Sequence, residues 1–315
     1  MLSYTIRRAG GMLISIFLVI SVTFILMHSV PGNPASVLLG PNATPQQVES
    51  LKESWGLDRP IWLQYYKYVT NVLRGDFGKS IYFQKPVLRI IFQRAETSVF
   101  LGLMSLLVVV GIGIPGGALA SIKPNSWLDN LMLLLALAGA SIPSFWLGLM
   151  LMNFFAGTLH LFPSSGFTSV IETGNILNLK NLVLPSIALG FVNAALVARA
   201  ARSSMLDVLR KDYVNTARAK GLNERTVIIK HSLRNAAIPI TTIVSFTFAK
   251  MVSAAVVTEN VFALPGIGSL VVQAILKRDY PVIQGVMLVV AILYVLINYL
   301  TDITYGYLDP RIRYG

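Results

Sequence analysis

The chain has 315 residues, with 26 Lys or Arg against 14 Asp or Glu, so its formal net charge at pH 7 is +12. Only 13% of its residues are charged and 54% are hydrophobic, whereas about a quarter of the residues of soluble domains are charged. This composition excludes a disordered chain, a collagen-like repeat and an ordinary soluble domain pair. The sequence contains no cysteine, which excludes disulfides, thiolate metal sites and thiol catalysis. We therefore predict an all-α, polytopic membrane protein.

Six apolar stretches are long enough to form membrane-spanning helices, because a hydrocarbon core about 30 Å thick needs about 20 apolar residues. The first stretch exceeds the apolar core of a signal peptide, which is about 7 to 15 residues, so we interpret it as a membrane anchor. Pro143 interrupts the third stretch and, like Pro115 in the second, is expected to bend its helix. The six expected spans are residues 9–30, 97–122, 131–155, 181–198, 236–257 and 282–301.

The distribution of Lys and Arg predicts the orientation of the chain. Arg7 and Arg8 precede the first span, and the connection 199–235 is rich in Lys and Arg. We therefore expect both termini and this connection to face the cytoplasm. The extracytoplasmic position of residues 31–96 follows from parity alone, because a loop of this length lies outside the rule. The expected organisation is residues 1–30 as cytoplasmic N-terminus and first span, 31–96 as external segment and 97–315 as transmembrane core.

The external segment contains the signals of two short helices. Thr44, Pro45 and Gln47 have the pattern of an N-cap, a first-turn proline and a capping-box partner, and Gly56 is placed to end that helix. A second helix is expected over residues 60–74. Its apolar residues recur at helical spacing, which suits either the membrane interface or another protein, or packing against the chain's own spans. These residues are Trp62, Tyr65, Tyr66, Val69, Val72 and Leu73.

The basic connection predicts two short cytoplasmic helices with a glycine corner. Residues 212–220 form the first helix, Gly221 ends it, and a second helix starts near Asn223. The positive charge by itself suits a topology signal or an attraction to anionic lipid. The small side chains of Ala217 and Ala219 favour a docking surface, because they permit close approach by another protein.

This connection resembles the signature of the membrane subunits of binding-protein-dependent ATP-binding-cassette importers, specifically the dipeptide, oligopeptide and nickel permease family. The general signature reads Glu-Ala-Ala, three residues, Gly, nine residues, then Ile-x-Leu-Pro. Ala217, Gly221 and Leu233 fit it. The chain departs from it at Asn215, Thr216, His231 and Arg234.

The departures resemble the peptide and nickel branch, which tends to read Thr-Ala-Arg-Ala-Lys-Gly and later His-x-Leu-Arg-Asn-Ala. This chain has those residues at 216–221 and 231–236. Further blocks along nearly the whole chain resemble the family in the same order. They are residues 56–60, 64–65, 75–80, 143–148, 265–268, 278–281 and 308–311.

The resemblance implies a type I ABC importer permease fold and half of a translocation path, for peptides or alternatively for nickel or another small solute. Implied partners are a second homologous permease, two cytoplasmic subunits that bind ATP and magnesium, and a solute-binding protein that meets the external segment. Membrane lipid surrounds the chain, and no nucleic acid partner is expected. The implied ATPase-coupling residues are Asn215, Thr216, Ala217, Arg218, Ala219, Lys220, Gly221, Glu224 and Arg225.

The residues themselves do not favour an enzyme, a cofactor or a metal site in this chain. Gly78-Lys79-Ser80 resembles the end of a phosphate-binding loop, but that motif needs a glycine where the chain has Leu73. The three histidines lack metal-ligand spacing. A secondary transporter is a further alternative, but the internal repeats and intramembrane coupling residues typical of that class are not visible.

Lys250 is the one Lys, Arg, Asp or Glu inside the expected spans. A cation at membrane depth is costly and normally faces a cavity or a partner. One hypothesis is that Lys250 and Asn153, with Glu259 further along the same helix, line the translocation path. The alternative is that Lys250 extends to the membrane interface. Separately, Gly113 and Gly117 have a spacing suited to close helix contact.

Overall fold

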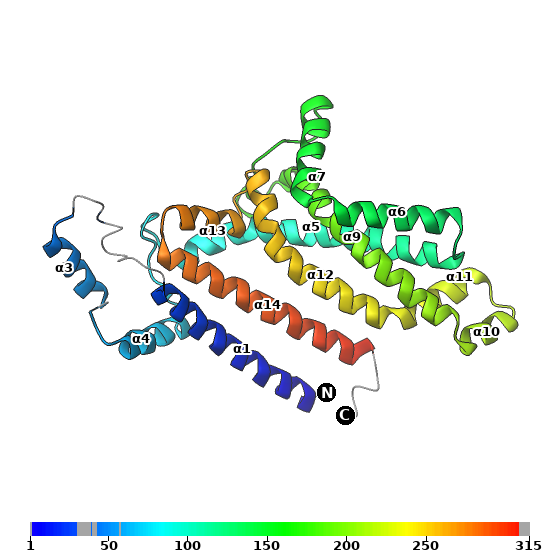
Figure 1. Cartoon of the computed structure of the whole chain (residues 1–315), viewed down its shortest axis with the longest axis horizontal. Coiled ribbons are helices and arrows are strands. Elements are labelled where there is room, and N and C mark those ends of the chain that lie inside the picture. Colours follow the sequence, from blue (N-terminus) through cyan, green and yellow to red (C-terminus); the bar gives the residue numbers. More distant parts are fainter. Residues whose placement is uncertain (1, 30–38, 40–42, 57, 309–315) are drawn as a thin grey trace. The chain divides into compact units, whose positions relative to one another are not determined.

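The computed structural model describes residues 2–29, 39, 43–56 and 58–308, and its regular structure in these ranges is helical apart from one isolated β-bridge. Residue contacts divide the chain into two units, one built mainly of Glu96–Gly268 and one of Ile6–Ala95 with Ser269–Leu296. The α-helices of Figure 1 are α1 Leu2–Ser29, α3 Pro45–Trp55, α4 Ile61–Leu73, α5 Val87–Ile122, α6 Trp127–Ser141, α7 Ser144–Leu151, α8 Val170–Thr173, α9 Lys180–Leu209, α10 Asp212–Ala219, α11 Glu224–Thr226, α12 Arg234–Val261, α13 Ile267–Leu276 and α14 Tyr280–Leu308.

Four helical stretches in the described ranges are long and apolar enough to cross a membrane. They contain the expected second, fourth, fifth and sixth spans. In α1 the described apolar part is the shorter stretch Gly10–Ile25, so the count of six spans stays a prediction. The four stretches are Val87–Ile122, Ile176–Leu209, Glu224–Val261 and Tyr280–Thr301.

The expected third span is not one bent helix but two helices, α6 and α7, which meet at an angle of 100°. The break lies at Ile142, whose backbone is extended (φ −86°, ψ 124°), followed by Pro143. The ring of a proline disfavours the helical conformation of the residue before it, which explains the interruption. Pro115 does not interrupt its helix, because α5 continues through it; a bend at Pro115 stays a prediction.

Close contact between α5 and α9 depends on three glycines, and it confirms the contact predicted from Gly113 and Gly117. A Cβ atom added to Gly117 would lie 2.3 Å from the carbonyl oxygen of Ala198, and one added to Gly113 would also meet the α9 backbone. The third glycine is on α9, where a Cβ at Gly190 would lie 2.7 Å from the carbonyl oxygen of Ser105. The two backbones therefore approach more closely than any side chain at these positions would allow.

α9 occupies the centre of its unit, where it packs against α6, α7 and α12 as well as α5 (Figure 1). Buried leucines of α9, such as Leu184 and Leu189, share a core with Leu101 of α5 and Met251 of α12. In a bilayer the lipid tails are as apolar as these side chains, so close van der Waals packing drives the association.

The two helices predicted within residues 31–96 are confirmed together with their ends. Thr44 and Gln47 form a complete capping box at the start of α3, and Gly56 ends that helix in the left-handed conformation, with φ 70°. α4 spans Ile61–Leu73, which agrees within a residue or two with the helix expected over residues 60–74.

Of the apolar residues that recur along α4, some pack against the chain's own helices and others are exposed. Tyr65 contacts α1, where its hydroxyl lies 2.6 Å from Ser21 Oγ and its ring packs edge-on against Phe24. Val72 joins a core with α1 and α14. Trp62, Tyr66 and Leu73 instead remain about two-thirds exposed or more. One side of α4 therefore packs against the chain's own helices, and the adjacent side is free to meet lipid or protein.

The contact between α5 and α9 leads to a test with a matched pair of glycines. We expect Gly117→Ala to destabilise the protein by about 1–3 kcal/mol, because the new methyl group overpacks the interface. Gly111→Ala, on the same helix, adds a methyl where nothing lies within 4 Å, so it should be neutral or slightly stabilising. Thermal unfolding of the two detergent-purified variants measures the difference. Equal Tm values would contradict the packing assignment.

Candidate functional site

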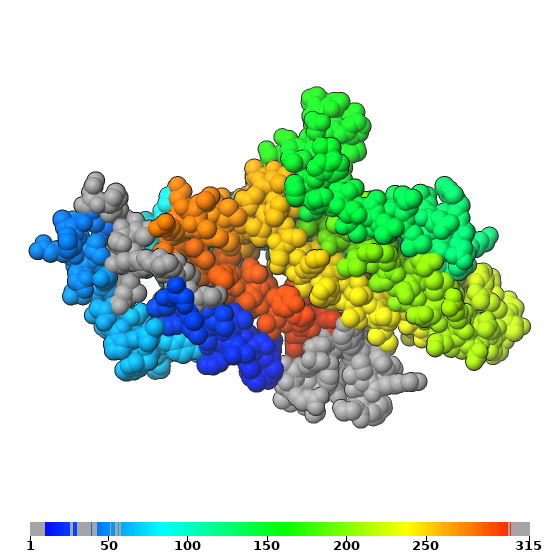
Figure 2. Space-filling model, in the orientation of Figure 1, coloured from blue at the N-terminus to red at the C-terminus, as the bar shows by residue number. Residues whose placement is uncertain are grey.

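The candidate site is the elbow formed by α10 and α11 at the end of α9, seen in yellow-green in Figure 2. α10 ends in a Schellman motif: Gly221 N–H donates to Arg218 O (2.9 Å) and Leu222 N–H to Ala217 O (3.4 Å). Gly221 has φ 78°, a left-handed conformation that glycine adopts without steric cost. Asn223 then caps α11 through its side chain, which accepts from Thr226 N–H (2.8 Å). The predicted two helices and glycine corner are confirmed.

The elbow has its own small apolar core. Val214 and Ala217 of α10 are buried against Val227, which lies in the π-helical turn Val227–Leu233 leading into α12. Ala217 thus faces inward, so its small side chain serves the packing of the elbow rather than the approach of another protein. The elbow core fixes α10 against the end of α9, where Val208 and Leu209 join it.

The outward side of the elbow presents most of the residues expected to couple to an ATPase. Among the expected contacts, Asn215, Thr216, Ala219 and Gly221 are exposed, as are all the charged ones. Two further apolar side chains are exposed there that sequence reasoning missed: Tyr213 is 45% exposed and Leu222 is 41% exposed. The sequence does show apolar residues at both ends of a short polar helix. Whether their side chains point outward depends on how α10 packs, which the sequence does not show.

Two of the expected coupling charges pair with each other. The Arg218 guanidinium donates to both Glu224 carboxylate oxygens, at 2.7 and 3.3 Å, and this carboxylate raises the pKa of Arg218. Both side chains are well exposed, so the pair contributes at most about 1 kcal/mol to stability. Its geometric effect is to bridge α10 and α11 across Gly221. In the described part of the chain, Lys220 and Arg225 form no ion pair and are exposed.

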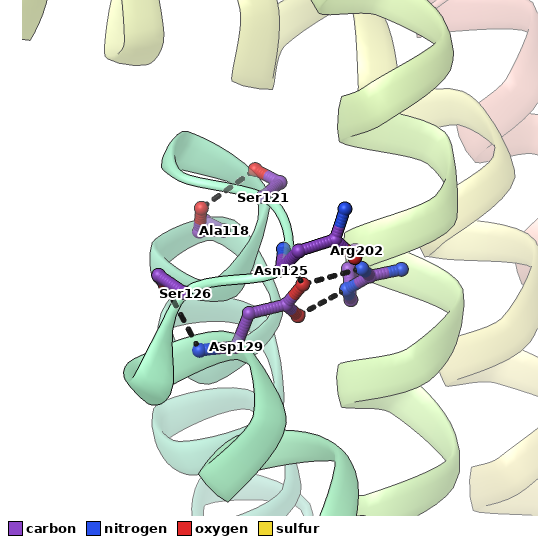
Figure 3. A network of polar contacts seen from close by, with 6 residues as sticks. All are labelled: Ala118, Ser121, Asn125, Ser126, Asp129 and Arg202. Carbon is purple, nitrogen blue, oxygen red and sulfur yellow. Dashed lines mark hydrogen bonds and ion pairs between the residues drawn. The ribbon is translucent and has the colours of Figure 1, made fainter.

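A buried ion pair holds α9 about two turns before the end of that helix (Figure 3). The Arg202 guanidinium of α9 donates to both Asp129 carboxylate oxygens, at 2.5 and 2.6 Å, and Asn125 N–H donates to the same carboxylate at 2.8 Å. Ser126 caps the start of α6 by accepting from Asp129 N–H. Sequence reasoning missed this pair, because 73 residues separate its members and no local spacing connects them.

The three residues expected in the translocation path have different surroundings. Lys250 and Asn153 are exposed, on α12 and in the π-helical turn after α7. Glu259 is buried, accepts a hydrogen bond from Ser98 Oγ (2.6 Å) and lies so close to Gly266 that a Cβ there would be 2.2 Å from its carboxyl carbon. Glu259 therefore stabilises the turn before α13. The role of Asn153, Lys250 and Glu259 in the translocation path stays a prediction.

The apparent phosphate-binding loop has another structure. Gly78 N–H donates to Asp76, and Ser80 is buried with its hydroxyl donating to Asp279 (2.5 Å), in a hairpin closed by the bridge between Lys79 and Pro86. Among the described residues no group of three His, Asp or Glu side chains is placed to hold a metal ion.

Comparison with protein families identifies the chain. Residues 113–314 match the family of binding-protein-dependent transport system inner membrane components, and residues 1–108 match the N-terminal region of the membrane component of such systems. The chain belongs to this family. It is therefore a multi-pass membrane component of a transport system and not itself an enzyme.

Relatives match over nearly the whole chain. The dipeptide transport system permease protein DppB of Alkalihalophilus pseudofirmus is 39% identical, over 100% of both chains. A probable peptide ABC transporter permease protein of Sinorhizobium fredii is 40% identical over 99% of both. The glutathione transport system permease protein GsiC of Escherichia coli is 38% identical, again over 100% of both chains.

A solved structure confirms the fold. An inward-facing structure of the MetNI methionine ABC transporter contains a chain that matches with a TM-score of 0.58 and 18% identity, covering 70% of this chain and 97% of that one. At this level of identity the likeness concerns the fold alone. The predicted all-α, polytopic type I importer fold is therefore confirmed.

The ion pair of Figure 3 gives a stability prediction. We expect Asp129→Asn to destabilise the protein by roughly 2–3 kcal/mol, because it leaves a largely buried guanidinium without its counter-ion. The expected loss of stability is smaller than for a fully buried ion pair, because the Arg202 side chain is 22% exposed to solvent. The double variant Asp129→Leu with Arg202→Met removes both charges and should recover most of the loss. Thermal unfolding in detergent measures both. A double variant no more stable than Asp129→Asn would argue against the pair.

Proposed function

We propose that this chain is the permease subunit of an ATP-driven importer that carries peptides across the cytoplasmic membrane, and that it forms half of the translocation path. The observation that carries the proposal is the identity of 38–40%, from end to end, with permeases named for dipeptides, peptides and glutathione. Glutathione is itself a small peptide, so the three names share one chemical class of cargo. Nickel complexes or other small solutes are the alternative cargo for the same architecture.

The proposed assembly places the termini and the elbow in the cytoplasm. Each of two ATPase subunits supplies a site for ATP and magnesium. One of them binds the elbow of this permease, and the other binds the elbow of a second homologous permease. A solute-binding protein delivers the peptide from outside, and lipid surrounds the spans. The positive charge of the connection 199–235 supports this orientation.

The elbow is suited to transmit a rigid-body motion. α9 is one continuous helix from Lys180 to Leu209. Its close contact with α5 and its ion pair with Asp129 hold it against α5 and α6. The elbow at its end therefore has little freedom to move independently of these helices. In the proposed mechanism, a displacement of α10 by the ATPase therefore moves α9 together with α5 and α6, and packed interfaces convert small displacements into discrete rearrangements. Tyr213 and Leu222 are the apolar side chains available for contact with the ATPase.

The glycine corner provides a specific test of coupling. A Cβ at Gly221 meets nothing within 4 Å in this chain, so within the permease a substitution there acts through the left-handed backbone. We expect Gly221→Val to reduce peptide-stimulated ATP hydrolysis and uptake at least tenfold, because a β-branched residue disfavours this conformation. Gly221→Asn should retain most activity, because asparagine tolerates it. Gly174→Val is the control, since Gly174 is equally open with φ 66° but caps α8. Normal uptake by Gly221→Val would contradict the role of the corner.

The energy source and the cargo are tested together in cells that express the complete system. We expect uptake of a labelled dipeptide to persist when a protonophore removes the proton gradient and to stop when ATP is depleted, because the proposed energy source is nucleotide hydrolysis. Excess unlabelled dipeptide or glutathione competes if the cargo is a peptide. Uptake that follows the proton gradient would instead indicate a secondary transporter, and competition by nickel salts alone would indicate the alternative cargo.

A further inference from the structure

A cluster of exposed cations surrounds the hairpin that precedes α5. The hairpin is closed by hydrogen bonds from Ser80 N–H to Lys85 O (2.9 Å) and from Val87 N–H to Gly78 O (3.0 Å). We call its exposed basic and aromatic side chains, together with those at the end of α13 in the same unit, the external basic surface. Its members are Lys79, Tyr82, Lys85, Lys277 and Arg278.

One buried carboxylate joins the two segments of this surface. Asp279 is fully buried and accepts from Ser80 Oγ (2.5 Å) and from the N–H groups of Ile81 and Tyr82 (both 3.1 Å). This holds the end of α13 against the hairpin, and the ammonium of Lys277 lies 4.8 Å from the centre of the Tyr82 ring. Buried contacts therefore set the backbone positions from which the cations extend.

The surface has an excess of positive charge. Four cations are exposed, and none of them forms an ion pair with a described residue. The nearest exposed carboxylate in sequence is Asp76, which accepts from Gly78 N–H (2.9 Å). The carboxylate of Asp279 is enclosed by its three donors, so it is not presented to a partner.

Arg278 occupies a position that normally belongs to glycine. α13 ends in a Schellman motif, with Arg278 N–H donating to Ile275 O (3.1 Å) and Asp279 N–H to Ala274 O (2.8 Å). At the left-handed position, where φ is 52°, the chain has arginine. The left-handed conformation costs about 1–2 kcal/mol for a residue with a Cβ. Backbone strain occurs at functional sites, so an arginine at this position is consistent with a function for its charge.

The depth of the hairpin favours a protein partner over a lipid head group. α5 begins at Val87, but Arg94 and Glu96 follow before its uninterrupted apolar run starts at Thr97. Ten residues of helix span about 15 Å. Each head-group layer is only about 5–8 Å thick, so along α5 the hairpin extends beyond it.

We propose that the external basic surface binds an acidic patch on the solute-binding protein. This inference rests on the proposed function, which supplies that partner and places the surface outside the cell. Clustered cations on a rigid support accelerate encounter with an acidic surface and set its orientation, with a strong dependence on ionic strength.

The test uses the complete transporter in neutral phosphatidylcholine nanodiscs and the purified solute-binding protein of the same system. We expect the double variant Lys79→Gln with Lys85→Gln to raise the Kd about five- to tenfold at low salt and to flatten its salt dependence, because it removes rim charges. The matched control is Lys67→Gln with Arg74→Gln, which removes two exposed cations of α4 and its C-cap. It should change the Kd less than twofold, and unchanged Tm values exclude misfolding in both.

The outcomes separate the inference from the proposed function. If the wild-type transporter binds the protein and its ATPase is stimulated while the hairpin variant behaves identically, the inference is wrong and the proposed function stands. A loss that appears only when the nanodiscs contain phosphatidylglycerol would assign the surface to lipid and would also overturn it. If the wild-type transporter shows no binding and no stimulation, the proposed function fails and this inference fails with it.

Discussion

The close approach of α5 to α9 is the contact on which the transmembrane core depends. In lipid there is no hydrophobic gain from bringing two apolar helices together, so the interface must come from dense packing. Glycines at 113, 117 and 190 allow the two backbones to touch. Because α9 also packs against α6, α7 and α12, its position determines where the connection to the elbow leaves the core.

Buried carboxylates define the turns of this fold. Asp129, Glu259 and Asp279 are each fully or almost fully buried, and each accepts hydrogen bonds from donors that are distant in sequence. An unpaired carboxylate in a low-dielectric environment would be very costly. Each of these acids therefore stabilises one specific local arrangement: the start of α6, the turn before α13 and the hairpin before α5.

The charges of the two candidate contact surfaces are organised differently. In the elbow, Arg218 and Glu224 neutralise each other and shape the corner between α10 and α11. In the proposed docking to an ATPase, the contacts come from exposed apolar side chains and from Lys220 and Arg225. In the external basic surface the cations have no acidic partner among the described residues, and a buried aspartate only positions them. The first arrangement suits a permanent contact and the second suits a partner that binds and leaves, since electrostatic attraction acts mainly on encounter.

The sequence by itself determined the features that depend on neighbouring residues. The capping box of α3, the left-handed Gly221, the apolar spans and the family blocks could all be predicted, because their hydrogen bonds, dihedral angles and hydrophobicity are local properties. Only the tertiary structure decided which side of a helix is covered. Ala217 and Tyr65 proved to face inward while Tyr213 and Tyr66 remained exposed, and Asp129 found its partner across 73 residues. Which side chains are buried depends on how helices that are distant in sequence pack together. Helical spacing shows only that two residues lie on the same side of a helix, and not what covers that side.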